Sequence, residues 1–233
     1  MLLRLFVSAD LGAGIEVVPT PGQAHYLGTV MRRGTGDAVA LFNGADGEWL
    51  ARIATLRKDR ATLIVERMLR PQSAEPNIWL AFALLKRDAT DLVVQKATEL
   101  GVSELRPLLT MRTLASRVNL DRLRAIATEA AEQSERLIVP GIAAPQPLTA
   151  LLADWPAARR LIAAVERQAA PAVPFADGAT GLLVGPEGGF TETELENLLT
   201  RPFVSAASLG PRILRAETAC IVGLAQLQVR RGD

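Results

Sequence analysis

The stretch that decides the fold is Leu183-Val-Gly-Pro-Glu-Gly-Gly-Phe190, together with the helix signal that follows it. An apolar run, Gly181-Leu-Leu-Val184, leads into a turn that holds three glycines, one proline and one acid. Thr191 is a suitable N-cap, and Glu194 three residues later completes a capping box. A strand that ends in a glycine turn before a helix is a common ligand site in α/β proteins. We therefore expect an α/β fold with a ligand at this turn.

The turn carries Glu187 and no lysine, which limits the kind of ligand that it suits. A P-loop needs a lysine for the phosphates, and a dinucleotide site needs the Gly-x-Gly-x-x-Gly pattern. The chain contains neither pattern at this position, so an enzyme that depends on a nucleotide or dinucleotide is disfavoured. Taken alone, the stretch is equally consistent with a plain tight turn before a helix.

Length and composition exclude several classes of protein. The 233 residues are 49% hydrophobic, which suits one large domain or two modest ones with a proper core. The single cysteine, Cys220, and the single histidine, His25, argue against a disulfide framework, a His/Cys metal site and a Ser-His-Asp triad. No apolar run reaches the length of a membrane span, and charge follows the first residues too early for a signal peptide. We expect a cytoplasmic protein without a bound metal and without a membrane partner.

Arginine is much more abundant than lysine, although the formal net charge is only +1. The planar guanidinium suits phosphates and base edges. A coding bias that also favours alanine, glycine and proline is the simpler explanation. The arginine content therefore does not by itself indicate a nucleic-acid partner.

The N-terminal part of the chain is rich in strand signals separated by turn residues. Strands are predicted over 2–7, 38–42, 48–53 and 60–66, with one short helix over 21–31. This pattern predicts a small β-barrel over residues 1–70. The polar segment 71–76, which is bracketed by prolines, is predicted to be the linker.

The remaining residues, 77–233, alternate between strand and helix signals. Strands are predicted over 77–85, 104–109, 160–165, 181–184 and 204–209, and helices over 88–100, 119–137 and 215–230. Such alternation predicts a mostly parallel sheet with helices on both faces. The second domain is therefore an α/β domain.

Three loops should gather at one edge of this sheet, because each follows a predicted strand. They are 109–112, 185–190 and 209–215. Glycines let the backbone approach a ligand closely. Arg212 and Arg215 are placed to reach an anionic partner at a helix start, with Glu217 able to orient one of them. The alternative is an ordinary surface ion pair that contributes about 0–1 kcal/mol.

A set of polar residues on the predicted helix and the single histidine each have two interpretations. Glu129, Gln133 and Arg136 share one stripe of the predicted helix, which fits a solvated face as well as a site. His25 is able to stack on RNA, but a packed histidine is the simpler interpretation.

Several segments together resemble the ribosomal RNA small subunit methyltransferase E family. In chain order they are Lys86, Gln95-Lys-Ala-Thr-Glu-Leu-Gly101, Glu129-Ala-Ala-Glu-Gln-Ser-Glu-Arg136, Gly185-Pro-Glu-Gly-Gly-Phe190 and Ser208-Leu-Gly-Pro-Arg-Ile-Leu-Arg-Ala-Glu-Thr-Ala219. The N-terminal part resembles the RNA-binding barrel of that family through Arg4-Leu-Phe6, His25 and Val30-Met-Arg-Arg-Gly-Thr-Gly-Asp37. The departures are small (Pro211, Ala216 and Met31), and none removes a polar group of the expected site.

The resemblance implies a SPOUT-type domain with a deep trefoil knot, joined to a PUA-like β-barrel. Nothing in the periodicity indicates a knot, and knots are rare in general. The resemblance also implies a homodimer that uses S-adenosylmethionine as methyl donor. The implied reaction is methylation of N3 of a uridine in the 16S ribosomal RNA of the small subunit, near the decoding centre.

The resemblance also implies roles for particular residues. The donor is expected to bind at Leu109, Val184, Gly185, Gly188, Gly189, Leu209, Gly210, Ile213, Leu214 and Thr218. RNA contacts are expected from Arg4, His25, Arg32, Arg33, Lys86 and Arg136. The chemistry of the implied reaction, and not the resemblance itself, makes Arg215 and Arg212 the expected catalytic residues, as stabilisers of the uracil anion, with Glu187 as a further catalytic candidate. No general base is identified, because Glu187, Glu217 and the RNA phosphates are all candidates.

A competing interpretation is a non-catalytic RNA-binding protein on the same scaffold. Such a protein would bind RNA but not the methyl donor. The two readings differ in one measurable property, the affinity for S-adenosylmethionine.

Overall fold

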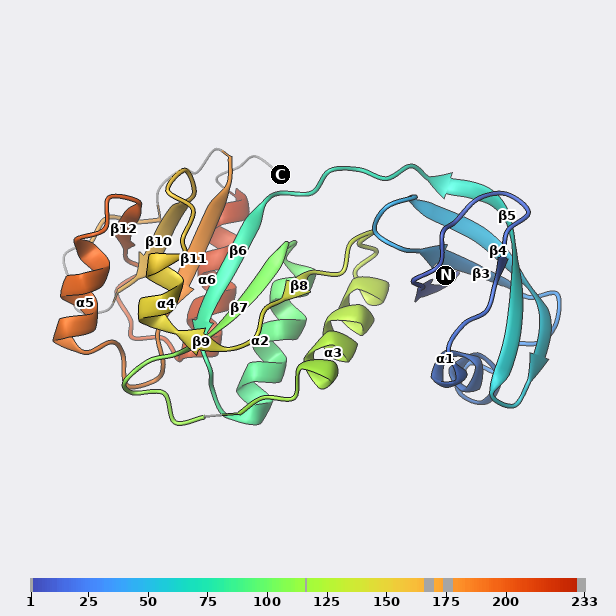
Figure 1. Ribbon diagram of the computed structural model, residues 1–233, viewed down its shortest axis with the longest axis horizontal. Helices are drawn as coiled ribbons and strands as arrows, with labels where there is room; N and C mark the ends of the chain where they lie inside the picture. The colour runs from blue at the N-terminus through green and yellow to red at the C-terminus, as the bar shows by residue number, and fades with distance from the viewer. Residues whose placement is uncertain (1, 116, 166–169, 174–177, 230–233) are drawn as a thin grey trace. The chain divides into compact units, whose positions relative to one another are not determined.

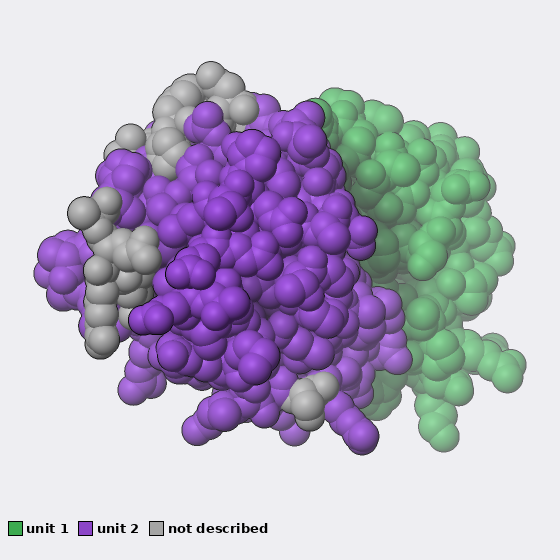
Figure 2. Space-filling view, turned by 60° about the vertical axis from the view of Figure 1, so that its left-hand side comes forward, with its two compact units in different colours: residues 1–74, 131–139 green, residues 75–130, 140–233 purple. Residues whose placement is uncertain are grey.

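The computed structural model describes residues 2–115, 117–165, 170–173 and 178–229. The chain forms two compact units, which Figure 2 distinguishes by colour. The first comprises residues 1–74 and 131–139, and the second comprises residues 75–130 and 140–233. Residues 71–77, which include the predicted linker, form neither helix nor strand. No sequence pattern predicted that residues 131–139 belong with the first unit.

The first unit is built on a five-stranded sheet with the order β1-β3-β4-β5-β2. The strands are β1 (Leu3–Phe6), β2 (Glu16–Val17), β3 (Ala38–Phe42), β4 (Glu48–Arg57) and β5 (Arg60–Arg70). β1 pairs with β3 in parallel, and the other pairs are antiparallel. Alternate side chains of β4 and β5, such as Ile53 and Leu63, are fully buried, which gives the sheet one apolar face. β2 is too short to be recognised from the sequence.

The predicted helix over 21–31 exists, but it changes character along its length. α1 (Pro21–His25) begins at Thr20, whose side chain forms a capping box with Gln23. A π-helical turn, Tyr26–Val30, continues it. The predicted extent is therefore close to the observed one.

α3 (Leu120–Gln133) ends earlier than predicted. Glu135 adopts a left-handed conformation with φ of 59°, and the Arg136 amide donates to the Ala131 carbonyl over 3.1 Å. This pattern is a Schellman motif, which closes a helix and turns the chain away. Arg136 consequently lies beyond the helix, and the predicted stripe of Glu129, Gln133 and Arg136 does not form on one helix face.

A buried arginine holds this helix end within the first unit. Arg4 is 8% exposed, and its Nε donates to Glu48 over 2.5 Å. Its terminal nitrogens donate to the carbonyls of Ala131, Glu132 and Arg136 over 2.8, 2.9 and 2.6 Å. A cation is favourable there, because carbonyls at a helix C-terminus carry partial negative charge. The expectation that Arg4 contacts RNA was wrong, because these interior partners occupy its guanidinium.

Glu48 lies between two arginines, and the unit should lose stability in acid for that reason. Burial alone would raise the pKa of Glu48, but hydrogen bonds from Arg70 and Arg4 outweigh it and lower the pKa. The resulting stabilisation is complete above the unfolded-state pKa of about 4.3 and is lost as the pH falls through the lower folded-state value. Urea unfolding of Glu48→Gln should therefore show a flatter acid limb than the unmodified chain. Identical acid limbs would contradict this assignment.

The second unit contains the predicted parallel sheet, with the order β12-β10-β11-β6-β7-β8 and with β9 also paired to β7 (Figure 1). All of its strand pairs are parallel. The strands are β6 (Ile78–Ala83), β7 (Glu104–Leu109), β8 (Gly141–Ile142), β9 (Gln146–Pro147), β10 (Arg160–Ala164), β11 (Thr180–Val184) and β12 (Val204–Ala207). Its helices, besides most of α3, are α2 (Arg87–Glu99), α4 (Leu148–Ala153), α5 (Glu192–Leu199) and α6 (Ala216–Val229).

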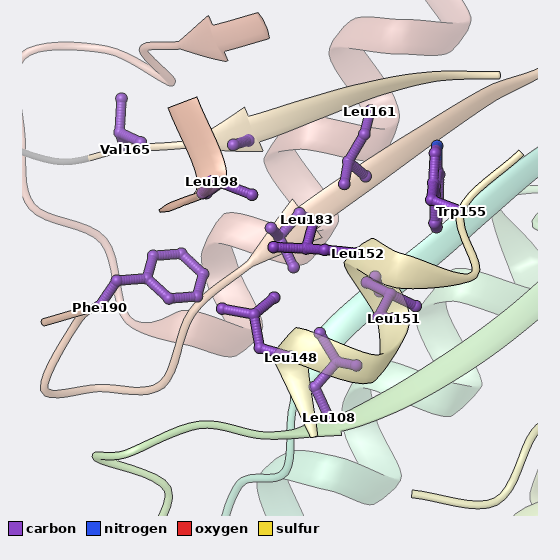
Figure 3. Close-up of a cluster of buried hydrophobic side chains, with 12 residues drawn as sticks. Leu108, Leu148, Leu151, Leu152, Trp155, Leu161, Val165, Leu183, Phe190 and Leu198 are labelled. Atoms are coloured by element: carbon purple, nitrogen blue, oxygen red, sulfur yellow. The ribbon is translucent and has the colours of Figure 1, made fainter. Parts of the chain in front are cut away.

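Helices cover both faces of this sheet, as predicted. α6 packs closely on one face, since a Cβ added at Gly223 would lie 2.7 Å from the Leu182 side chain. α4 and α5 cover the other face, where Leu183 joins a buried cluster with Leu148 and Leu198 (Figure 3). Neighbouring residues of β11 therefore pack against helices on opposite faces of the sheet. Both faces of the strand are buried, so its sequence is a continuous apolar run. β8, β9 and α4 were not predicted from the sequence, and the predicted end of the last helix, Arg230, lies outside the described residues.

Candidate functional site

The predicted site lies at the carboxyl edge of the second sheet. β7, β11 and β12 belong to one parallel sheet, so the segments that follow them leave at the same edge. This edge is where open α/β sheets bind ligands. The three loops predicted from the sequence therefore leave the sheet at the same edge, as expected.

The glycine turn after β11 is held in a defined shape. The Gly189 amide donates to the Pro186 carbonyl over 2.8 Å, and Gly189 has a φ of 68°. A Cβ added at Gly185 would lie 3.0 Å from the Phe190 ring, so the ring packs directly on that glycine. Phe190 is 8% exposed and extends into the cluster under α4 and α5 (Figure 3). The turn is thus fixed to the core at its far end.

The predicted capping box follows the turn. The Thr191 side chain accepts from the Glu194 amide, and Glu194 accepts in return from the Thr191 amide over 2.9 Å. The same carboxylate accepts from the Met111 amide over 2.9 Å. Glu194 therefore caps α5 and also ties the loop after β7 to the turn after β11.

Arg112 lies in the first of the three predicted loops, and no role was predicted for it from the sequence. Its guanidinium donates to the Gly188 carbonyl over 2.7 Å and to the Phe190 carbonyl over 3.3 Å. The only available signal was its place just past a strand at the ligand edge. The loop after β7 and the glycine turn are therefore in direct contact.

The third loop, after β12, is open and basic. Arg212 and Arg215 are exposed, and Glu217 is half-buried. Within the described ranges, neither arginine forms an ion pair, so the ordinary surface pair considered from the sequence is not observed. Both guanidiniums are available to an anionic partner.

Two glycines give a ligand access to the backbone. Gly189 and Gly210 have φ values of 68° and 129°, and a Cβ at either would meet no atom within 4 Å. Backbone that is exposed in this way suits a ligand held by amides and carbonyls. A methyl donor with an adenine ring, as the resemblance implies, fits such residues.

A hollow of about 820 Å³ adjoins the third loop. Among the residues assigned to the donor, Leu209 and Gly210 line it, and the other wall includes Val222 and Gln226 of α6. The glycine turn does not line this hollow. The exposed glycine backbone and this hollow are therefore separate features, which share Gly210 of the third loop.

The remaining donor residues differ in exposure. Val184 is buried at the end of β11, whereas Leu109 and Leu214 are half-buried, and Ile213 and Thr218 are exposed. The side chains of these last four residues are thus more accessible to a ligand than that of Val184. Glu187 is exposed at the tip of the glycine turn.

The predicted RNA contacts fall into two groups. His25 and Arg32 are exposed in the first unit, Arg33 is half-buried, and Lys86 is exposed at the start of α2. The interpretation of His25 as a packed residue was wrong, because its only described partner is Thr29, at 3.3 Å from Nδ1. Arg136 is 8% exposed, which corrects its expected place on an RNA-facing surface.

The described residues contain no group of three or more His, Cys, Asp or Glu side chains that would hold a metal ion. None of the helices in the described part of the chain has the length and apolar character that a membrane span requires. Burial raises the pKa of the Cys220 thiol, which keeps this cysteine protonated and unreactive.

Two known protein families match successive parts of the chain. Residues 72–228 match the RNA methyltransferase domain family, and residues 19–66 match the RNA methyltransferase PUA domain family. Both matches lie where the structure has the corresponding sheet.

Individual relatives extend the likeness over nearly the whole chain. The chain is 32% identical to a ribosomal RNA small subunit methyltransferase E of Rickettsia conorii, over 97% of this chain and 95% of the relative. It is 35% identical to the protein of that name from Synechocystis sp., over 97% and 77%. Among solved structures, the Neisseria gonorrhoeae ribosomal RNA small subunit methyltransferase E bound to S-adenosyl methionine superposes with a TM-score of 0.90, at 29% identity and 98% coverage of both chains.

Proposed function

The chain belongs to the ribosomal RNA small subunit methyltransferase E family, and from this we propose that it methylates N3 of one uridine in 16S ribosomal RNA, near the decoding centre. The methyl donor is S-adenosylmethionine. The observation that carries the proposal is the pairing, at one sheet edge, of ligand-accessible glycine backbone with two arginines that form no ion pair in the described ranges.

The chain's own residues must hold the donor, align the base and stabilise charge. When bound, S-adenosylmethionine supplies an electrophilic methyl group. Backbone groups near Gly189 and Gly210 hold the donor against the edge, and the fixed turn limits its orientations, so that proximity provides much of the rate. The turn has no lysine because the group held there is not a phosphate.

Arg215 is proposed to stabilise the uracil anion, with Arg212 beside it. N3–H of uracil is a weak acid, and loss of its proton spreads negative charge over O2 and O4. An arginine placed at those oxygens lowers the energy of the anion and of the transition state. Glu187, Glu217 or an RNA phosphate then accepts the proton.

The first unit is proposed to bind the RNA backbone. His25 and Arg32 are exposed on it, and Arg33 is partly so. Contacts of this kind make binding depend on salt, because each neutralised phosphate releases counterions. The target uridine must be unstacked or single-stranded for N3 to be reached.

Four further properties come from family membership and are proposed for this chain. They are a deep trefoil knot of the SPOUT type in the second unit, a homodimer, recognition of the assembled small subunit, and a cytoplasmic location. The parallel strand order of the second sheet is compatible with the knot.

Methyl transfer can be tested directly. The chain is incubated with labelled S-adenosylmethionine and small subunits that lack modifications, and the product nucleotide is located by mass spectrometry. We expect label on N3 of a single uridine. RNA binding without donor binding or transfer would favour the alternative, a non-catalytic RNA-binding protein, and label at another atom or base would refute the proposed specificity.

A further inference from the structure

We propose that Arg112 is a positioning residue that fixes the donor-binding glycine turn in its binding-competent shape. The inference rests on the proposed function, because it concerns how the same site is organised. Arg112 lies on the loop after β7 and is exposed, so its contacts with the turn are not a by-product of core packing.

The guanidinium of Arg112 bridges both sides of Gly189. It donates to the Gly188 carbonyl over 2.7 Å and to the Phe190 carbonyl over 3.3 Å. Gly189 has positive φ, and a Cβ added there would meet no atom within 4 Å. Its own amide donates to the Pro186 carbonyl, and the bonds from Arg112 restrain the carbonyls on its two sides. Both hydrogen bonds come from one terminal nitrogen, Nη1, and they orient the carbonyls on either side of this glycine.

The aliphatic part of the Arg112 side chain explains why residue 188 is a glycine. A Cβ added at Gly188 would lie 3.3 Å from Cδ and 3.5 Å from Cβ of Arg112. Gly188 does not have positive φ, so its backbone conformation does not require glycine. Its lack of a side chain instead lets the turn lie flat on the stem of Arg112.

The loop that carries Arg112 is itself fixed. The Thr110 amide donates to the Thr113 hydroxyl over 2.9 Å, and the Thr113 amide donates to the Thr110 carbonyl over 3.1 Å. Glu194 accepts from the Met111 amide, so a second link joins the same loop to the residues after the turn. Arg112 therefore acts from a rigid base.

The consequence is preorganisation of the donor site. Ordering a flexible glycine turn at the moment of binding reduces affinity, and ordering it in the free protein avoids that cost. Loss of Arg112 should thus weaken donor binding and leave the chemical step nearly unchanged at saturating donor.

Calorimetry with S-adenosylmethionine and amide hydrogen exchange test the inference together. Arg112→Ala should raise the Kd about tenfold, as expected for about 1.4 kcal/mol from two hydrogen bonds, and keep kcat within about twofold. Exchange at the Gly189 amide should be faster in the ligand-free variant. Arg112→Lys should recover part of both effects, because an ammonium can reach one carbonyl. Arg160→Ala, at an exposed arginine on the opposite edge of the sheet, is the matched control and should change neither.

The outcomes separate this inference from the proposed function. Failure of the unmodified chain to bind S-adenosylmethionine would overturn both. Normal binding by the unmodified chain, with unchanged Kd and unchanged Gly189 exchange in Arg112→Ala, would overturn the inference alone. A fall in kcat with unchanged Kd would also overturn it, since it would place Arg112 in the chemical step.

Discussion

Arg215→Ala should lower kcat by about 10²- to 10³-fold, the usual effect of removing one preorganised group that stabilises an oxyanion. The affinity for S-adenosylmethionine should change by about twofold at most, because an interaction made mainly in the transition state does not hold the ground-state donor. The physical reason is the position of Arg215, which is exposed, forms no ion pair among the described residues, and precedes α6 at the ligand edge. Single-turnover kinetics with small subunits and calorimetry with the donor measure the two effects separately.

Two comparisons make this result specific to Arg215. Arg160→Ala removes an exposed arginine from the amino end of β10, on the opposite edge of the same sheet, and should leave kcat unchanged. Arg215→Lys keeps the charge but not the planar donor pair, and should restore only part of the rate. Equal losses of donor affinity and kcat in Arg215→Ala would show that Arg215 binds the donor, and the assignment would then be abandoned.

Glu48→Ala should reduce the free energy of unfolding of the first unit by about 3–5 kcal/mol, as expected when one partner of a buried ion pair is removed. Arg4 and Glu48 have side-chain exposures of only 7% and 8%, and Arg70 binds the second carboxylate oxygen. Without Glu48, the Arg4 charge stays buried against three backbone carbonyls and the Phe42 ring, with no anionic partner among the described residues. Urea unfolding, followed by hydrogen exchange of β1 and β3 amides, reports on this unit specifically.

The matched control lies on the same pair of strands. Glu66 pairs with Arg52 across β4 and β5, and these side chains are 37% and 51% exposed. Glu66→Ala should therefore cost about 0–1 kcal/mol, because water screens exposed pairs. Similar losses in the two variants would mean that the Arg4–Glu48 pair has no special role in the first unit.

Sequence patterns predicted the second unit well because its signals are local. The continuous apolar run at β11 marks a strand covered on both faces, and the capping box of Thr191 and Glu194 marks a helix start. Both signals lie within a few residues, so they survive without knowledge of the tertiary structure. The short pieces β8, β9 and α4 were missed because they are too brief to show a period.

Contacts between residues that are far apart in the sequence could not be predicted from these local patterns. Arg4 looked like one more basic residue of an RNA-binding unit, yet its partners lie near residue 131 and at Glu48. The contacts of Arg112 with the glycine turn likewise join residues far apart in the sequence. Burial and pairing decide the role of an arginine, and neither is visible in composition or spacing. Arg212 and Arg215 are exposed, as a role at the site requires, and their catalytic role stays a prediction.

The two-part construction of the first unit has a consequence for synthesis on the ribosome. Residues 1–74 emerge first, but the carbonyls that Arg4 binds and the apolar contacts of Ala131 and Leu137 with Phe42 come from residues 131–139. At a synthesis rate of roughly 5–20 residues per second, several seconds pass between the synthesis of residue 74 and that of residue 139. During that interval Arg4 lacks the three carbonyls, and the partners already made are Glu48 and the Phe42 ring for Arg4 and Arg70 for Glu48. The N-terminal unit is thus begun first and completed only after residues 75–130 of the second unit have been made.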